Sequence, residues 1–211
     1  CSPQMLQRQL EAVFAELKPR AAKTGMLLTA KNISLIAGFF RRLARSGKPP
    51  LIVDPVLVST SGTRLLEPRA LKILMEKLLP AATLVTPNLS EAEILTAQKI
   101  DSLATMREAA RTIHSRWGCA VLVKGGHLRD AAQATDLFFD GQQEITLSSP
   151  FVKGVRTHGT GCVYSAAICA GLALGKDLPS AVRAGKKFVT QAISRSYRIG
   201  PRGRHFVLQL P

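Results

Sequence analysis

A cysteine follows a short glycine-rich stretch at the start of a run of small apolar residues. Residues 159–162 read GTGC, and the run after them predicts a helix. The first N–H groups of a helix have no partner within it, and the helix dipole attracts anions to that end. The backbone of Gly159, Thr160 and Gly161 is therefore a candidate cradle for a phosphate. A Gly161 that simply packs against a neighbouring element would explain the same pattern.

The thiol of Cys162 is the candidate base or nucleophile of this segment. The positive end of a helix dipole favours the thiolate, which is the reactive form. Most isolated cysteines are instead small buried residues, and this is our interpretation of Cys119 and Cys169. The cysteines have neither CxxC nor zinc spacing, so we expect reduced thiols in a cytoplasmic protein.

Polar residues follow three predicted strands. Asp54 comes directly after LIV, Asn88 after TLVTP and Lys124 after AVLV. In α/β folds, ligands collect at the carboxyl ends of the strands. Lys124, together with Gly126, would present a cation and backbone amides to a polyphosphate. The alternative is a solvated lysine beside a glycine turn.

Asn88 and Glu91 are three residues apart at a predicted helix start and allow two interpretations. An Asn cap with an acidic residue in the first turn is a very common arrangement. Mg²⁺, however, prefers few protein oxygens, several waters and substrate phosphates. The pair, with Asp54 sharing the role, is therefore also a candidate magnesium site.

The elements that must position these residues alternate between strand and helix. Extended segments are predicted at residues 21–27, 51–55, 83–88 and 120–124, and two alternating runs around Asp140 and Gly141 predict a hairpin. Helices are predicted at residues 4–17, 32–46, 68–79, 90–96, 103–117, 160–174 and 179–197. This order predicts an α/β fold with a mostly parallel central sheet flanked by helices, in one domain over residues 1–211.

Basic residues greatly outnumber acidic ones. The chain has 29 Lys and Arg against 14 Asp and Glu, a net charge of +15, and residues from about 198 to 211 form a basic tail. Such a balance favours polyanionic ligands. Because the positive residues are dispersed, we expect a solvated basic face or charges without their acidic partners, rather than a nucleic-acid ligand. The longest uncharged apolar stretch, residues 159–175, is too short to span a membrane.

Four segments together resemble a known family. VDPVLVSTSGTRLL, LVTPNLSEAEIL, VLVKGGHL and THGTGC, in this order, resemble the hydroxymethylpyrimidine/phosphomethylpyrimidine kinases of thiamine biosynthesis, in the ribokinase-like superfamily. The resemblance runs from about residue 3 to near residue 196. It implies a ribokinase-like fold and ATP-dependent phosphorylation of 4-amino-5-hydroxymethyl-2-methylpyrimidine, a small-molecule substrate, and then of its monophosphate.

The resemblance also implies roles at the start of the predicted helix. Cys162 matches the position of the catalytic base that faces the substrate hydroxyl, where sugar kinases of the superfamily have aspartate. The amides of Gly159, Thr160 and Gly161 match the anion hole for the phosphoryl group in flight. Phosphoryl transfer depends on such positioning and charge stabilisation more than on covalent chemistry.

The remaining candidates receive cofactor roles from the same resemblance. Asn88 and Glu91 match the magnesium-associated pair of the superfamily. Lys124 and Gly126 match the nucleotide side, and Asp54 matches an acidic residue near the phosphates. The cofactors implied are thus ATP and Mg²⁺.

One departure from the family pattern is large. Family members begin with a strand and a glycine-rich stretch of the type GSDSGGGAG, which this chain lacks. We therefore expect an N-terminally truncated fold with much of the pyrimidine pocket absent. Two alternatives stay open beside the pyrimidine kinase: a pyridoxal-type kinase, and a non-catalytic remnant or basic binding module. A homodimer also stays open.

Overall fold

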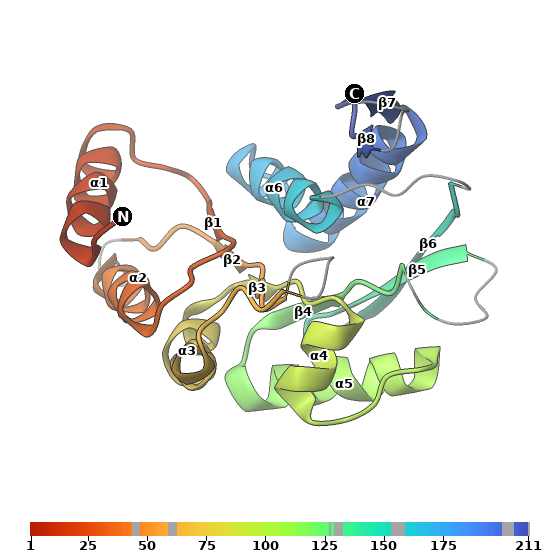
Figure 1. Cartoon of the computed structure of the whole chain (residues 1–211), viewed down its shortest axis with the longest axis horizontal. Coiled ribbons are helices and arrows are strands. Elements are labelled where there is room, and N and C mark those ends of the chain that lie inside the picture. The colour runs from red at the N-terminus through yellow and green to blue at the C-terminus, as the bar shows by residue number, and fades with distance from the viewer. Residues whose placement is uncertain are drawn as a thin grey trace.

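The structure is a computed structural model, which describes residues 1–43, 47–58, 63–126, 128, 133–152, 159–199 and 205–210 (Figure 1). Its helical elements are α1 (Pro3–Glu16), α2 (Ala30–Leu43), α3 (Pro68–Ile73), η1 (Leu74–Leu78), η2 (Leu79–Ala81), α4 (Leu89–Thr96), α5 (Leu103–Trp117), α6 (Thr160–Ala173) and α7 (Leu178–Ser194). Its strands are β1 (Ala22–Thr24), β2 (Leu51–Val53), β3 (Leu84–Val85), β4 (Ala120–Val123), β5 (Gln133–Phe139), β6 (Glu144–Pro150), β7 (Tyr197–Ile199) and β8 (His205–Val207).

The first six strands form one sheet in sequence order, from β1 to β6. The pairings from β1 through β4 are parallel, and those of β4 with β5 and β5 with β6 are antiparallel. The β5–β6 pair is the hairpin that was predicted around Asp140 and Gly141, and it joins the parallel strands through the antiparallel pairing of β5 with β4. The described sheet is thus mostly parallel, as predicted, and β1 lies at one of its edges.

Alternate side chains of the short parallel strands face opposite sides of the sheet. On β2, Leu51 and Val53 belong to an apolar cluster with α2, α3, α4 and α5, whereas Ile52 belongs to a second cluster with α6 and α7. Both faces are covered, which explains why these strands are apolar along their whole length. Figure 1 shows α6 and α7 on one side of the sheet and α3, α4 and α5 on the other.

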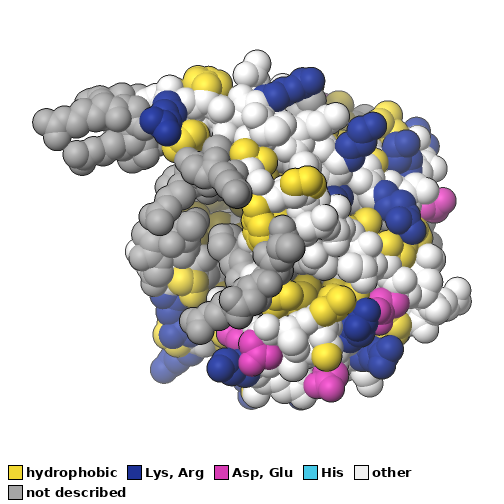
Figure 2. Space-filling view, turned by 90° about the vertical axis from the view of Figure 1, so that its right-hand side faces the viewer, with side chains coloured by type: hydrophobic (Ala, Val, Ile, Leu, Met, Phe, Trp, Pro, Cys, Tyr) yellow, Lys and Arg dark blue, Asp and Glu magenta, His cyan; other side chains and the backbone are white. Residues whose placement is uncertain are grey.

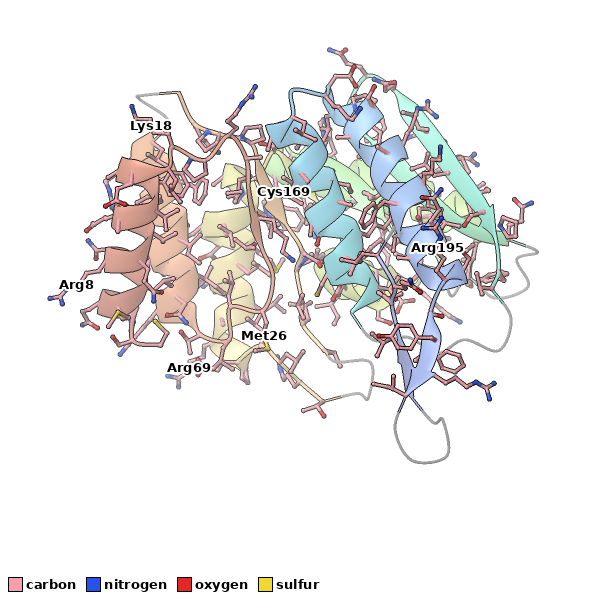
Figure 3. The ribbon with its side chains drawn as sticks, turned by 90° about the horizontal axis from the view of Figure 1, so that it is seen from above. Arg8, Lys18, Met26, Arg69, Cys169 and Arg195 are labelled. Carbon is pink, nitrogen blue, oxygen red and sulfur yellow. The ribbon has the colours of Figure 1, made fainter. Side chains whose placement is uncertain are left out.

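Helices α6 and α7 pack side by side, and α6 lies against β1 and β2 (Figure 3). Its first turn therefore comes close to the carboxyl ends of the parallel strands. Within the described ranges, each helix is too short or too polar to cross a membrane.

Two predicted helices differ from their expected form. The helix predicted at residues 68–79 is α-helical only to Ile73 and continues as the π-helix η1 and the 3₁₀-helix η2. Pro80 has no N–H, which ends regular α-helical hydrogen bonding there. The helix predicted at residues 179–197 ends at Ser194. The predicted end of α2 at residue 46 lies outside the described residues.

The basic tail contains a strand pair that the sequence analysis missed. Strand β7 pairs antiparallel with β8, and the Arg198 guanidinium lies 5.2 Å from the centre of the Phe206 ring. Tyr197, assigned to a helix from the sequence, is the first residue of β7 because backbone pairing with β8 holds it extended.

Candidate active site

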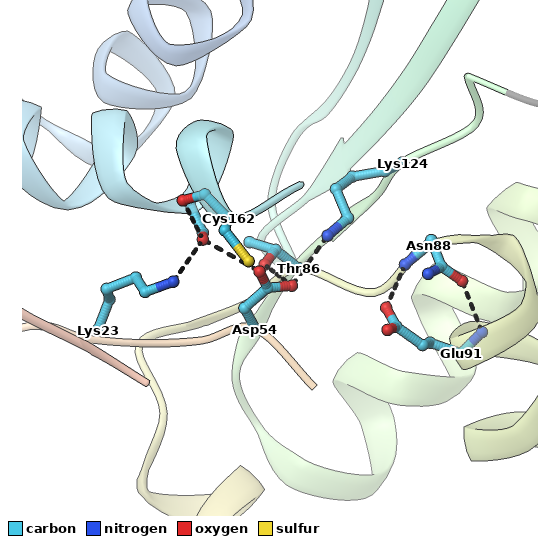
Figure 4. Close-up of polar contacts among 8 residues, drawn as sticks. Lys23, Asp54, Thr86, Asn88, Glu91, Lys124 and Cys162 are labelled. Carbon is cyan, nitrogen blue, oxygen red and sulfur yellow. Dashed lines mark hydrogen bonds and ion pairs between the residues drawn. The ribbon is translucent and has the colours of Figure 1, made fainter. Parts of the chain in front are cut away.

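The carboxyl ends of three parallel strands meet beside the first turn of α6 (Figure 4). Asp54 follows β2, Thr86 follows β3 and Lys124 follows β4. The Lys124 ammonium lies 2.9 Å from Asp54 Oδ1, and residue 124 forms a parallel bridge with Asn88. The structure therefore brings together the polar strand ends that the sequence singled out.

Asp54 is buried, with 2% of its surface exposed, and several donors hold its carboxylate. Besides Lys124, Thr86 Oγ1 donates to Oδ1 at 3.3 Å and Ser165 Oγ donates to Oδ2 at 3.1 Å. Neither Thr86 nor Ser165 was predicted from the sequence. A signal existed for Ser165, which is a polar residue within an apolar helix, three positions after Cys162.

Gly159 is the N-cap of α6, and its φ of +77° lies in the left-handed region that favours glycine. Its carbonyl oxygen accepts from the Val163 N–H at 2.9 Å, which begins the helix. Two residues later, a Cβ on Gly161 would lie 2.9 Å from the Lys124 nitrogen. The absence of a side chain at Gly161 therefore lets the ammonium approach the start of α6, so this glycine does pack against a neighbouring element.

Cys162 lies exposed in the first turn of α6. Its thiol points toward the side of the site on which Asp54 lies (Figure 4). Cys119 is buried and Cys169 is half-buried, which agrees with their interpretation as packing residues. All four cysteines are free thiols.

Asn88 and Glu91 form a reciprocal capping box at the start of α4. Asn88 Oδ1 accepts from the Glu91 N–H at 2.9 Å, and Glu91 Oε2 accepts from the Asn88 N–H at 2.8 Å. The geometry is thus that of the common capping arrangement. This geometry alone does not indicate a magnesium site, which depends on the chemistry of the Glu91 carboxylate.

Glu91 is 4% exposed, and burial raises its pKa to about 7. The Asp54 carboxylate raises it too, while Lys124 and the Asn88 N–H oppose the increase. A cation beside Glu91 would favour its ionised form. Within the described ranges no three His, Cys, Asp or Glu residues cluster as metal ligands. Mg²⁺ binds through one or two carboxylates, waters and substrate phosphates, so the few oxygens present fit this ion.

A buried ion pair lies behind the turn after β4. Asp136 Oδ1 accepts from the Gly125 N–H at 3.0 Å, and Asp136 Oδ2 lies 2.8 Å from the Lys186 nitrogen. Burial raises the pKa of Asp136, and Lys186 opposes this increase. The pair fixes the turn that carries Lys124 and Gly126, and it was not predicted from the sequence.

A second lysine approaches the site from the edge strand. Lys23 on β1 donates to Ser165 Oγ at 3.2 Å, from the side of the site opposite Lys124 (Figure 4). Lys23 was predicted to lie in an extended segment, and no role was predicted for it. On the face shown in Figure 2, Lys and Arg side chains are spread among other residues rather than gathered in one field.

Residues 1–207 match the protein family described as phosphomethylpyrimidine kinase. The chain is 44% identical over 199 residues to the hydroxymethylpyrimidine/phosphomethylpyrimidine kinase of Rhizobium meliloti (strain 1021). That match covers 94% of this chain and 73% of the relative.

Two solved structures extend the comparison. The phosphomethylpyrimidine kinase from Clostridium difficile 630 is 34% identical, with a TM-score of 0.78 and coverage of 92% of this chain and 77% of that one. The pyridoxal kinase from Staphylococcus aureus in complex with ADP is 31% identical, with a TM-score of 0.85. The match covers 99% of this chain and 74% of that one. These likenesses confirm the ribokinase-like α/β fold that was expected.

Proposed function

The chain belongs to the phosphomethylpyrimidine kinase family, and we propose that it phosphorylates a hydroxymethylpyrimidine and then the resulting monophosphate, using ATP. The observation that carries the proposal is the Asp54–Lys124 ion pair directly beside the first turn of α6. That turn carries the exposed thiol of Cys162. A cation, backbone amides and a candidate base therefore converge at one edge of the sheet.

We assign the proton transfer to Cys162. Its thiolate takes the proton of the acceptor hydroxyl while the hydroxyl oxygen bonds to the γ-phosphorus, and the bond from that phosphorus to the leaving oxygen of ADP breaks. The backbone amides of Gly159, Thr160 and Gly161 hold the transferring group. Donors placed in advance at a helix start stabilise charge that develops during transfer.

The nucleotide side of the site is assigned to the turn after β4. Lys124 is held by Asp54, and Gly126 lies in the turn that the buried Asp136 carboxylate anchors through the preceding N–H. We propose that Lys124 contacts the ATP phosphates. Asp54 orients this ammonium.

We propose that Mg²⁺ is held on the side of Glu91 and Asn88, where it would neutralise phosphate charge. The support is the buried Glu91 carboxylate, whose pKa burial raises to about 7, because a cation placed beside it would stabilise its ionised form. Asp54 is the next carboxylate that faces this region.

A pyridoxal-type acceptor is the second candidate, because the similarity to the Staphylococcus aureus pyridoxal kinase is high in fold. The two are separated by comparing the pyrimidine alcohol and pyridoxal as acceptors under the same conditions. A higher kcat/KM for pyridoxal would replace the pyrimidine assignment.

The activity itself is tested with the purified chain, ATP, Mg²⁺ and each acceptor. Cys162→Ala is expected to abolish turnover while ATP binding, measured by calorimetry, stays largely intact. Cys1→Ala removes another exposed thiol and serves as the matched control. Unchanged turnover in Cys162→Ala would remove this residue from the mechanism.

Two finer features belong to the same proposal. We place the reaction in the cytoplasm, where the four free thiols would stay reduced. Sedimentation at several protein concentrations decides between monomer and homodimer.

A further inference from the structure

Ser165 is a buried hydroxyl that joins three groups of the site. It is 1% exposed, and its Oγ lies 3.1 Å from Asp54 Oδ2, 3.1 Å from the Cys162 carbonyl oxygen and 3.2 Å from the Lys23 nitrogen. These contacts connect α6 to β1 and β2. None of the roles proposed above involves Lys23 or Ser165.

The available protons decide which group donates and which accepts in each of these hydrogen bonds. A lysine ammonium can only donate, so Ser165 Oγ accepts from Lys23. The single hydroxyl proton of Ser165 then remains for Asp54 Oδ2 or for the Cys162 carbonyl. A hydrogen bond to a charged acceptor is the stronger one, so the proton points to Asp54.

The result is a continuous chain of polar groups across the site. It runs from Lys23 to Ser165, from Ser165 to Asp54, and from Asp54 to Lys124. The two oxygens of Asp54 are divided between its two ends. The orientation of the carboxylate therefore depends on Ser165 as much as on Lys124.

The same serine lies one helical turn after Cys162. Its hydrogen-bond partners fix the position of α6 relative to the ends of β1 and β2. A shift of this turn would move the thiol of Cys162 and the amides before it together. Misplacement of reacting groups by about 1 Å can lower a rate about a hundredfold.

We propose that Lys23 and Ser165 are a positioning pair that orients Asp54 and the first turn of α6, and thereby Cys162. They act on the reaction without touching either substrate. This inference rests on the proposed function, in which Cys162 takes the acceptor proton.

The first test is a double-mutant cycle on turnover. Lys23→Met and Ser165→Ala are each expected to lower kcat about tenfold or more, with KM for ATP nearly unchanged. Because both act through one contact, the double variant should be no slower than the slower single variant. Lys23→Arg keeps a positive donor and should recover part of the loss.

Two matched controls test whether the loss of any helical serine hydroxyl, or of any lysine, would lower kcat. Ser194→Ala removes a hydroxyl that, like Ser165, bonds a carbonyl three residues earlier in its own helix, at 2.8 Å from the Gln191 oxygen. Lys31→Met removes an exposed lysine from α2. Neither control should change kcat. A thermal unfolding curve recorded for every variant checks that the variant is folded.

A second readout does not require turnover. Alkylation of Cys162 by iodoacetamide is followed by mass spectrometry, with the exposed Cys1 of the same molecule as internal reference. Loss of the Lys23 contact to Ser165 releases the first turn of α6, which carries the thiol, so Lys23→Met should change the rate of Cys162 alkylation about threefold relative to Cys1. In the Ser165→Ala background the same change should have little effect, because Lys23 is no longer held.

Additive losses in kcat, or equal alkylation rates in all variants, would overturn the positioning pair. A wild-type chain that phosphorylates neither acceptor would instead overturn the proposed function. In that case the alkylation rates still decide whether Lys23 acts through Ser165.

Discussion

Replacing Glu91 with glutamine removes a buried negative charge but keeps a side-chain oxygen that can accept from the Asn88 N–H. The substitution therefore preserves the capping geometry of α4 while abolishing ionisation. Glu91→Gln is therefore a direct test of the raised pKa of the buried Glu91 carboxyl group.

The sign follows from the two states of the carboxyl group. Below pH 4.5, Glu91 is protonated in both the folded and the unfolded chain, so its ionisation adds nothing to stability. As the pH rises toward 7, the unfolded chain ionises while the folded protein keeps the proton, because burial holds the pKa of Glu91 at about 7. The free energy of unfolding of the wild type therefore falls through this window and is level above it.

The magnitude follows from the same pKa values. A change from 4.5 to about 7, at about 1.36 kcal/mol per pH unit, corresponds to roughly 3 kcal/mol. The wild type should thus lose about 3 kcal/mol relative to Glu91→Gln between pH 4.5 and pH 8. In urea this is a difference of about 1 M or more in the unfolding midpoint.

The assay is urea unfolding of both proteins from pH 4.5 to pH 8.5 in buffer with EDTA. Glu108→Gln, an exposed substitution on α5, is the control and should shift stability by no more than about 0.5 kcal/mol. Adding ATP and Mg²⁺ at pH 8 should stabilise the wild type more than Glu91→Gln, because a cation favours the ionised carboxylate. Parallel pH profiles for the wild type and Glu91→Gln would refute the electrostatic reasoning.

Lys186→Met leaves its carboxylate partner buried without a counter-charge and should destabilise the protein by about 3–5 kcal/mol in urea unfolding. Lys187→Met, on the exposed neighbour in α7, should change stability by less than about 0.5 kcal/mol, and equal effects would contradict the role of the ion pair. Gly125→Ala places a Cβ 2.2 Å from the Thr135 backbone oxygen, so we expect a loss of about 1–3 kcal/mol and weaker ATP binding by calorimetry. Gly126→Ala has no neighbour within 4 Å of the added carbon, and its stability should match the wild type.

Much of the fold could be predicted because the relevant signals are local. The short apolar runs before Asp54 and Lys124 are typical of buried parallel strands, and both form such strands here. The turn at Asp140 and Gly141 marks the β5–β6 hairpin in the same way. The β7–β8 pair was missed because each strand has three residues and β7 is exposed along its whole length, so it shows no alternation of buried and exposed residues.

By itself, the sequence determined the start of α6 and the three strand ends, because glycine, capping residues and apolar periodicity act within a few positions of one another. Only the tertiary structure decided which partners these residues have. Lys23 and Ser165 are 142 positions apart, and Lys186 and Asp136 are 50 apart. Contacts at such separations depend on how strands and helices pack, and burial by that packing, rather than any local pattern, is what raises the pKa of Glu91.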